Sequence, residues 1–205
     1  MNLNKFLTFQ DILRLYRNKR IFLITGYKTF KFLKKKKIDL KLNKLKFLKI
    51  YFKKESVPQY NELKALIIEC KKINPEVIIG LGGGTVIDYA KLTRFFLNEK
   101  KIIFDAKKII LNKKNLKKLI CIPTTCGSGA ESTTFSVLYK RNKKYSLNNR
   151  LMIPNFYSLI PNYLTNMSKK IATPPALDVF AQTIESIMSL NSNKKSLRFS
   201  YKSLN

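Results

Sequence analysis

Residues 75–91, PEVIIGLGGGTVIDYAK, hold the pattern that is most informative about the fold. The apolar run over residues 77–81 predicts a buried strand, and residues 85–96 predict the helix that follows it. The three glycines between them allow a close approach to the backbone, and free N–H groups at a helix start favour an anion. The sequence therefore predicts an anion site at this turn, with the pyrophosphate of a nucleotide as the leading ligand.

A second polar loop follows another apolar stretch. Residues 119–122 predict a strand, and residues 122–134 read IPTTCGSGAESTT. Hydroxyl groups and open backbone N–H groups suit phosphate oxygens and a ribose, although this loop alone would indicate only a flexible polar segment. Ligands of parallel α/β sheets bind beyond the carboxyl ends of the strands. Two such loops at the ends of predicted neighbouring strands therefore favour a nucleotide site.

Apolar strand-like runs alternate with amphipathic helical segments along the chain. Strands are predicted at 21–25, 47–52, 77–81 and 119–122, and helices at 9–16, 60–73 and 85–96. This alternation predicts an α/β fold with a doubly wound, mostly parallel, Rossmann-like sheet. After Pro123 we expect short strands at 135–139 and 156–160, joined by a basic, Asn-rich hairpin, and helical structure from residue 171 onward.

The composition narrows the class of protein. The chain has 205 residues, and a hydrophobic content of 45% is sufficient for a buried core. Its 41 Lys+Arg against 12 Asp+Glu give a net charge of +29. A strongly positive chain is one that can bind nucleic acid, so this class of protein has to be considered. The lysines are dispersed along the chain and far outnumber the arginines, so we expect no specific nucleic-acid binding.

The cysteines and the N-terminal residues bear on the compartment. Cys70, Cys121 and Cys126 are odd in number and show no metal-binding spacing, so free thiols in a reducing compartment are expected. Residues 1–20 carry charges throughout, and no apolar stretch reaches the length of a membrane span. These features predict a cytoplasmic protein without a signal peptide and without membrane association.

Three motifs together resemble one family. Residues 82–91, GGGTVIDYAK, look like the segment G-G-G-S-x-x-D-x-A-K, and residues 123–132, PTTCGSGAES, look like P-T-T-x-G-[TS]-G-[SA]-E. Residues 176–186, ALDVFAQTIES, are similar to the segment that opens the same family's helical domain. In this order and spacing the motifs resemble the iron-containing (group III) alcohol dehydrogenases, which are related more distantly to dehydroquinate synthase.

The resemblance implies an NAD(P)-dependent oxidoreductase that interconverts a primary alcohol and an aldehyde by metal-assisted hydride transfer. It implies an NAD(P)-binding α/β domain over residues 1–168 and the first helices of an incomplete helical metal-binding domain over residues 169–205. Read without the family, Asp88 can also be a carboxylate that stabilises the helix start, and Lys144 one more solvated lysine. The residues that match cofactor-binding positions are Gly82, Gly83, Gly84, Thr85, Asp88, Thr124, Thr125, Ser128 and Lys144.

The metal site departs from the family pattern. The family's divalent metal, iron or zinc, polarises the alcohol oxygen and is usually held by one aspartate and three histidines. Asp178 matches the aspartate, but Gln182 stands where the first histidine usually lies, and an amide is a weaker ligand. A glutamine at this position resembles the motif of a subset of the family, which is similar to phosphonoacetaldehyde reductase. Because the sequence contains no histidine, we expect the chain alone to hold no catalytic metal, and we assign no catalytic residue.

Other functions fit part of the pattern. A degenerate nucleotide-binding module without redox activity needs the two loops but not the metal, whereas a nucleic-acid-binding protein and a synthase of the dehydroquinate type are weaker alternatives. NAD and NADP are not distinguished, since no clear acidic residue follows the strand at 47–52, and Lys53 and Lys54 indicate tolerance of a phosphate. The apolar side of residues 171–190 predicts a homo-oligomer or association with a partner.

Overall fold

Six parallel strands form the central sheet of the protein, which a computed structural model describes for residues 5–35, 42, 45–104, 116–161 and 169–204. The order across the sheet is β1-β8-β5-β4-β2-β3, and its neighbouring strands are parallel. The predicted doubly wound α/β fold is thereby confirmed. The strands span Lys5–Phe6 (β1), Arg20–Gly26 (β2), Phe47–Lys53 (β3), Val77–Gly82 (β4), Lys118–Pro123 (β5) and Phe156–Tyr157 (β8).

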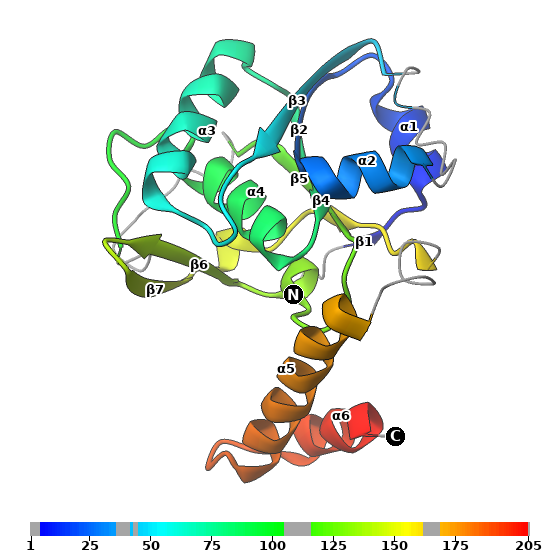
Figure 1. Ribbon diagram of the computed structural model, residues 1–205, viewed down its shortest axis with the longest axis vertical. Coiled ribbons are helices and arrows are strands. Elements are labelled where there is room, and N and C mark those ends of the chain that lie inside the picture. Colours follow the sequence, from blue (N-terminus) through cyan, green and yellow to red (C-terminus); the bar gives the residue numbers. More distant parts are fainter. Residues whose placement is uncertain (1–4, 36–41, 43–44, 105–115, 162–168, 205) are drawn as a thin grey trace.

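Helices cover both faces of this sheet (Figure 1). Their bounds are Phe9–Tyr16 (α1), Tyr27–Lys35 (α2), Tyr60–Ile73 (α3) and Gly84–Phe96 (α4). The side chains of β2 divide between the two faces. Ile21 and Leu23 pack in the apolar cluster that includes α1 and α2, and Phe22 and Ile24 pack in the cluster that includes α3 and α4. A strand that is buried on both faces requires the continuous apolar run seen in the sequence.

The strand and the helix that flank the glycine run pack closely. A Cβ atom built on Gly80 of β4 would lie 2.8 Å from Cβ of Ala90 in α4, so this strand-to-helix distance depends on glycine. Leu92, Phe95 and Phe96 of the same helix are buried in the core. Because α4 is enclosed along its length, its first turn is fixed at the carboxyl end of β4.

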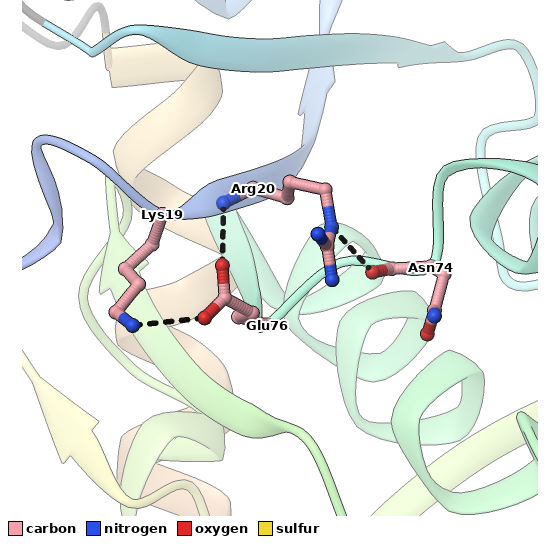
Figure 2. Close-up of polar contacts among 4 residues, drawn as sticks. All are labelled: Lys19, Arg20, Asn74 and Glu76. Atoms are coloured by element: carbon pink, nitrogen blue, oxygen red, sulfur yellow. Dashed lines mark hydrogen bonds and ion pairs between the residues drawn. The ribbon is translucent and has the colours of Figure 1, made fainter.

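Polar side chains join the elements at the opposite end of the sheet (Figure 2). Glu76 accepts a hydrogen bond from Lys19 Nζ at 2.9 Å and another from the Arg20 backbone N–H at 3.1 Å. Arg20 Nε donates to the carbonyl oxygen of Asn74 at 3.0 Å, where α3 ends in a left-handed residue with φ 44°. These contacts hold the amino ends of β2 and β4 together, away from the glycine turn.

A separate two-stranded hairpin consists of β6 (Phe135–Lys140) and β7 (Lys143–Asn148). The predicted pairing of β6 with residues 156–160 is wrong, because β8 joins the main sheet, parallel to β5 and β1. The sequence did not indicate β7, because Leu147 is its one buried side chain and the segment lacks an apolar alternation. Two short 3-10 helices flank the hairpin: Ala130–Ser132 and Arg150–Met152.

Two further helices, α5 (Lys169–Met188) and α6 (Lys194–Leu204), extend from the α/β part (Figure 1). They contact each other through a 3.0 Å hydrogen bond between the hydroxyl groups of Ser186 and Ser200. The predicted boundary between the two domains falls beside residues 162–168, which lie outside the described residues, and it stays a prediction. Among the described residues, no helix has both the length and the apolar content needed to cross a membrane.

Candidate functional site

The two predicted loops lie against each other at the carboxyl ends of β4 and β5. Thr124 donates its backbone N–H to the carbonyl oxygen of Gly82 at 3.0 Å. A Cβ atom built on Gly83 would lie 3.1 Å from Thr125 Oγ1, which is tighter than nine in ten contacts of real Cβ atoms. The glycine turn and the threonine-rich loop are therefore one structural unit, and a larger residue than glycine would narrow the space between them.

The first turn of α4 presents backbone N–H groups at this junction. Gly83 is the N-cap of the helix and supplies no capping side chain, and its carbonyl oxygen accepts from the N–H groups of Val86 and Ile87. The N–H groups of Gly84 and Thr85, at the first two helical positions, have no acceptor within the helix. Together with the positive end of the helix dipole, these donors favour an anion.

Hydroxyl groups lie beside the same turn. A Cβ atom built on Gly84 would lie 3.5 Å from Ser128 Oγ, an ordinary contact distance, and the Ser128 side chain is exposed. Thr125 Oγ1 lies next to Gly83, as described above. Backbone N–H groups and hydroxyl groups are the donors that phosphate oxygens accept, so these residues fit the pyrophosphate of a dinucleotide.

The hydroxyl group of Thr85 is used within the protein. Its Oγ1 donates a 2.9 Å hydrogen bond to the carbonyl oxygen of Ser56, in the loop that follows β3. The side chain therefore joins that loop to the glycine turn, and the backbone N–H of Thr85 is the group that faces a ligand in our interpretation.

Asp88 lies one turn further along α4 in a partly buried position beside β6. Burial raises the pKa of its carboxyl group to about 7, against opposing effects from Lys91, the Val137 N–H, Ser136 and Lys144. The Ser136 hydroxyl is itself buried beside this carboxyl group. This enclosure disfavours the alternative in which Asp88 is a solvated carboxylate that only stabilises the start of the helix.

Lys91 is a buried cation of this region that sequence reasoning did not single out. Its Nζ donates to the carbonyl oxygen of Phe135 at 2.7 Å and to Thr133 Oγ1 at 3.1 Å, which fastens the β6–β7 hairpin to α4. The sequence signal was its position three residues after Asp88, because residues three apart share one face of a helix. Lys144 of β7 is exposed and close enough for its charge to act on Asp88.

A buried network, also missed, holds the loop after β3. The Glu62 carboxylate accepts from the backbone N–H groups of Lys54 at 2.5 Å and Glu55 at 3.0 Å. The Tyr89 hydroxyl donates to the same carboxylate at 2.7 Å and accepts from the Gln59 N–H at 2.7 Å. No sequence signal separated Glu62 from an ordinary solvated carboxylate near the start of a helix.

Asp178 and Gln182 lie one helical turn apart on the exposed side of α5. Gln182 Nε2 donates to Asp178 Oδ2 at 2.8 Å, and the pair provides at most two protein ligands. Among the described residues, no group of three or more His, Cys, Asp or Glu is placed to hold a metal ion. Zinc sites take three or four protein ligands. These two residues therefore do not form a metal site by themselves, and their role as ligands stays a prediction.

The start of α5 contacts the threonine-rich loop. Gly127 has φ 131°, and a Cβ atom built on it would lie 2.8 Å from both Cβ and the carbonyl oxygen of Pro175. Glycine is required here by both the backbone conformation and the space. This contact places the helical segment on the β5 side of the candidate nucleotide site.

Comparison with known proteins adds a family to this geometry. Residues 3–161 match the family described as iron-containing alcohol dehydrogenase. The alcohol dehydrogenase of Thermococcus barophilus is 33% identical over 135 residues, which are 62% of this chain and 36% of the relative. The phosphonoacetaldehyde reductase of Streptomyces viridochromogenes is 27% identical over 148 residues, which are 68% of this chain and 38% of the relative.

A solved structure shows the same fold. The NADH-dependent butanol dehydrogenase A of Thermotoga maritima matches with a TM-score of 0.83 and 16% identity, over 98% of this chain and 54% of that structure. The chain thus spans about half the length of the solved relative, and little more than a third of the curated relatives align with it. The family match extends over most of the sequence, and the chain belongs to the iron-containing alcohol dehydrogenase family.

Proposed function

We propose that the chain binds NAD or NADP where its two loops meet and acts in the interconversion of a primary alcohol and an aldehyde. The observation that carries the proposal is the contact between residues 82–84 and residues 124–128, including the hydrogen bond from Thr124 to Gly82. The alcohol dehydrogenase and phosphonoacetaldehyde reductase relatives support a small alcohol or aldehyde as the substrate.

Each residue of the site has a role in this proposal. The N–H groups of Gly84 and Thr85 bind the pyrophosphate, and the hydroxyl groups of Thr125 and Ser128 donate to its oxygens. Asp88, with a pKa of about 7, exists in both protonation states at neutral pH and can donate to or accept from a ribose hydroxyl. A bound dinucleotide would supply the nicotinamide that accepts or donates hydride.

A nucleotide-binding module without redox activity is the second candidate, and the Asp178–Gln182 pair favours it. The amide donates to the carboxylate at 2.8 Å, and the two side chains give too few ligands for a catalytic metal. Consumption of NADPH or NADH with propanal, measured with and without added Fe²⁺ or Zn²⁺, distinguishes the candidates. Metal-dependent turnover supports the oxidoreductase, and saturable cofactor binding without turnover supports the module.

Cofactor binding is tested by fluorescence titration of the chain with NADH and NADPH. Gly84 has room for a Cβ atom, so Gly84→Asp and Gly84→Asn form a matched pair at the first helical position. Both side chains suit a helix start, but the carboxylate repels a phosphate whereas the amide does not. We expect saturable binding by the wild type and the asparagine variant, and binding at least about tenfold weaker in the aspartate variant. The proposal would be overturned if the wild type bound neither NADH nor NADPH.

The proposal includes a cytoplasmic location and association with another chain. Cys70, Cys121 and Cys126 are all free thiols, which supports a reducing compartment, and we place the protein in the cytoplasm. Exposed apolar side chains on α5, including Phe180 and Met188, support a homo-oligomer or association with a partner.

A further inference from the structure

The edge of the sheet that carries the glycine turn continues across β2 to β3. Parallel pairing places Thr25 beside Leu81, and Gly26 beside Lys53. Lys53, the last residue of β3, therefore lies at the same edge as the glycine turn, two strands away from β4. Because neighbouring strands lie about 4.8 Å apart, the backbone of Lys53 is roughly 10 Å from that of the turn.

The Lys53 side chain lies beside Gly26, at the contact distance of a side chain at that position. A Cβ atom built on Gly26 would lie 3.9 Å from Lys53 Cε. Lys53 is half-buried, and its Nζ donates to the carbonyl oxygen of Glu55 at 2.6 Å. An ammonium group has three N–H bonds, so two remain for a ligand. The Lys53 ammonium group is therefore held in place at the carboxyl ends of the strands, the same edge of the sheet that carries the glycine turn.

The chain that follows Lys53 touches the predicted phosphate site. Ser56 accepts the hydrogen bond from Thr85 Oγ1, and Thr85 belongs to the first turn of α4. Glu62 and Tyr89 hold the rest of this loop, as described above. The loop that begins after Lys53 is therefore joined to the first turn of α4 by a hydrogen bond.

The contact of α5 with the threonine-rich loop supports one direction for the bound cofactor. Gly127 meets Pro175 on the β5 side, and Asp178 follows on the same helix. If the reacting nicotinamide faces this helical segment, the adenosine end extends the other way from the glycine turn, over β2 and β3. That direction brings the adenosine ribose to Gly26 and Lys53.

The residues at this edge distinguish the two dinucleotides. Dinucleotide-binding folds place a carboxylate on the ribose 2′-hydroxyl of NAD, or a cation on the 2′-phosphate of NADP. β2 ends in glycine, and the Glu62 carboxylate is buried and bound to backbone N–H groups. Glu55 is exposed and is the carboxylate that would favour NAD if it bound the ribose. The Lys53 side chain lies beside Gly26, and its ammonium group is held at this edge by the carbonyl oxygen of Glu55.

We propose that Lys53 binds the 2′-phosphate of the cofactor and makes the site selective for NADP(H) over NAD(H). This inference rests on the proposed nucleotide site and adds the identity of its ligand.

The test compares the affinities of NADPH and NADH for the wild type, Lys53→Met and Lys49→Met. Lys49 lies four residues earlier on the same side of β3, toward the amino end of the sheet, and its variant removes an equal charge. We expect the wild type and Lys49→Met to bind NADPH at least about tenfold more tightly than NADH. We expect Lys53→Met to lose this preference while its NADH affinity stays within about twofold, which shows that the site is still folded.

Two results separate failure of this inference from failure of the proposed function. Equal affinities in the wild type, a preference for NADH, or a preference that survives Lys53→Met would overturn the role of Lys53 and leave the nucleotide site standing. Binding of neither cofactor by a wild-type chain with a cooperative unfolding transition would overturn both.

Discussion

The hydroxyl group of Tyr89, in the middle of α4, donates a 2.7 Å hydrogen bond to the Glu62 carboxylate at the start of α3. Through this pair the helix that carries the glycine turn also fixes the loop after β3. The same hydroxyl accepts from the Gln59 backbone N–H, so both ends of the loop depend on it. Two segments that contribute to the proposed cofactor site are thereby held in one arrangement.

Tyr89→Phe should destabilise the protein by about 1–3 kcal/mol, because it leaves the partly buried Gln59 N–H without its acceptor and removes one of the three donors to the Glu62 carboxylate. Urea unfolding measures the loss, and hydrogen exchange at Lys54, Glu55 and Gln59 should become faster. Tyr27→Phe is the control, because Tyr27 is 62% exposed. Equal stability of the two variants would show that the Tyr89 hydroxyl does not hold the loop.

Gly82→Ala should destabilise the fold by about 1–3 kcal/mol, because its Cβ atom would lie 2.6 Å from Val86 Cγ2. Gly84→Ala is the control, since its Cβ atom meets Ser128 Oγ at 3.5 Å without a clash. The loss of unfolding free energy caused by Gly82→Ala should be smaller in a Val86→Ala background than in the wild type, because Val86→Ala removes the methyl groups that the new Cβ atom meets. An alanine at position 82 that leaves the urea midpoint unchanged would contradict the close packing of the turn.

Asp88 should make stability fall as pH rises from about 4 to about 7, because its pKa is raised from an ordinary value near 3.9 to about 7. Below pH 4 both the folded and the unfolded chain hold the proton, and above pH 7 both have lost it. Between these values the unfolded state releases its proton first, so the native state loses stability on the order of 4 kcal/mol.

The measurement is the difference in unfolding free energy between the wild type and Asp88→Asn at several pH values. This difference should move against the wild type over that interval and level off above it, since other carboxyl groups cancel in the comparison. A flat difference from pH 4 to pH 8 would show that Asp88 titrates at an ordinary pKa.

The isolated chain should associate through α5 and α6. Leu177, Phe180 and Met188 of α5 and Phe199 of α6 are each more than half exposed. Phe180→Ser with Met188→Ser should lower the apparent mass in light scattering at high concentration, because the exposed apolar area falls. Ile68→Ser, on α3 and 52% exposed, is the control. Persistent association in the double variant would place the contact elsewhere.

Strong periodicity made much of the fold predictable. The helix expected at 60–73 is α3, and the helix expected at 9–16 is α1, because each carries one buried face between clear ends. The strand now called β2 was predicted from its apolar run, which is buried on both faces. Short or polar elements gave no such signal. β1 has two residues and was not predicted, and β8 forms only the first two residues of the strand predicted at 156–160. The many lysines of α2 obscured its buried side, where Leu33 enters the core.

Some features of the candidate site were likewise predictable from the sequence, and others were not. The contact of the glycine turn with the threonine-rich loop followed from a parallel sheet, because neighbouring strands end at one edge. The roles of Glu62, Tyr89 and Lys91 depend on burial and on partners that are distant in sequence, and no local pattern encodes them. The Asp178–Gln182 pair was predicted at the spacing of one helical turn, but its internal hydrogen bond required the structure.

The measurement that tests the central claim most directly is a titration of ¹⁵N-labelled chain with NADPH, followed by the amide resonances. The account predicts the largest shifts at Gly83, Gly84, Thr85, Thr125 and Ser128, where free N–H groups and hydroxyl groups meet at the start of α4. Saturable shifts confined to other parts of the chain, or none at all, would contradict a nucleotide site at the junction of the two loops.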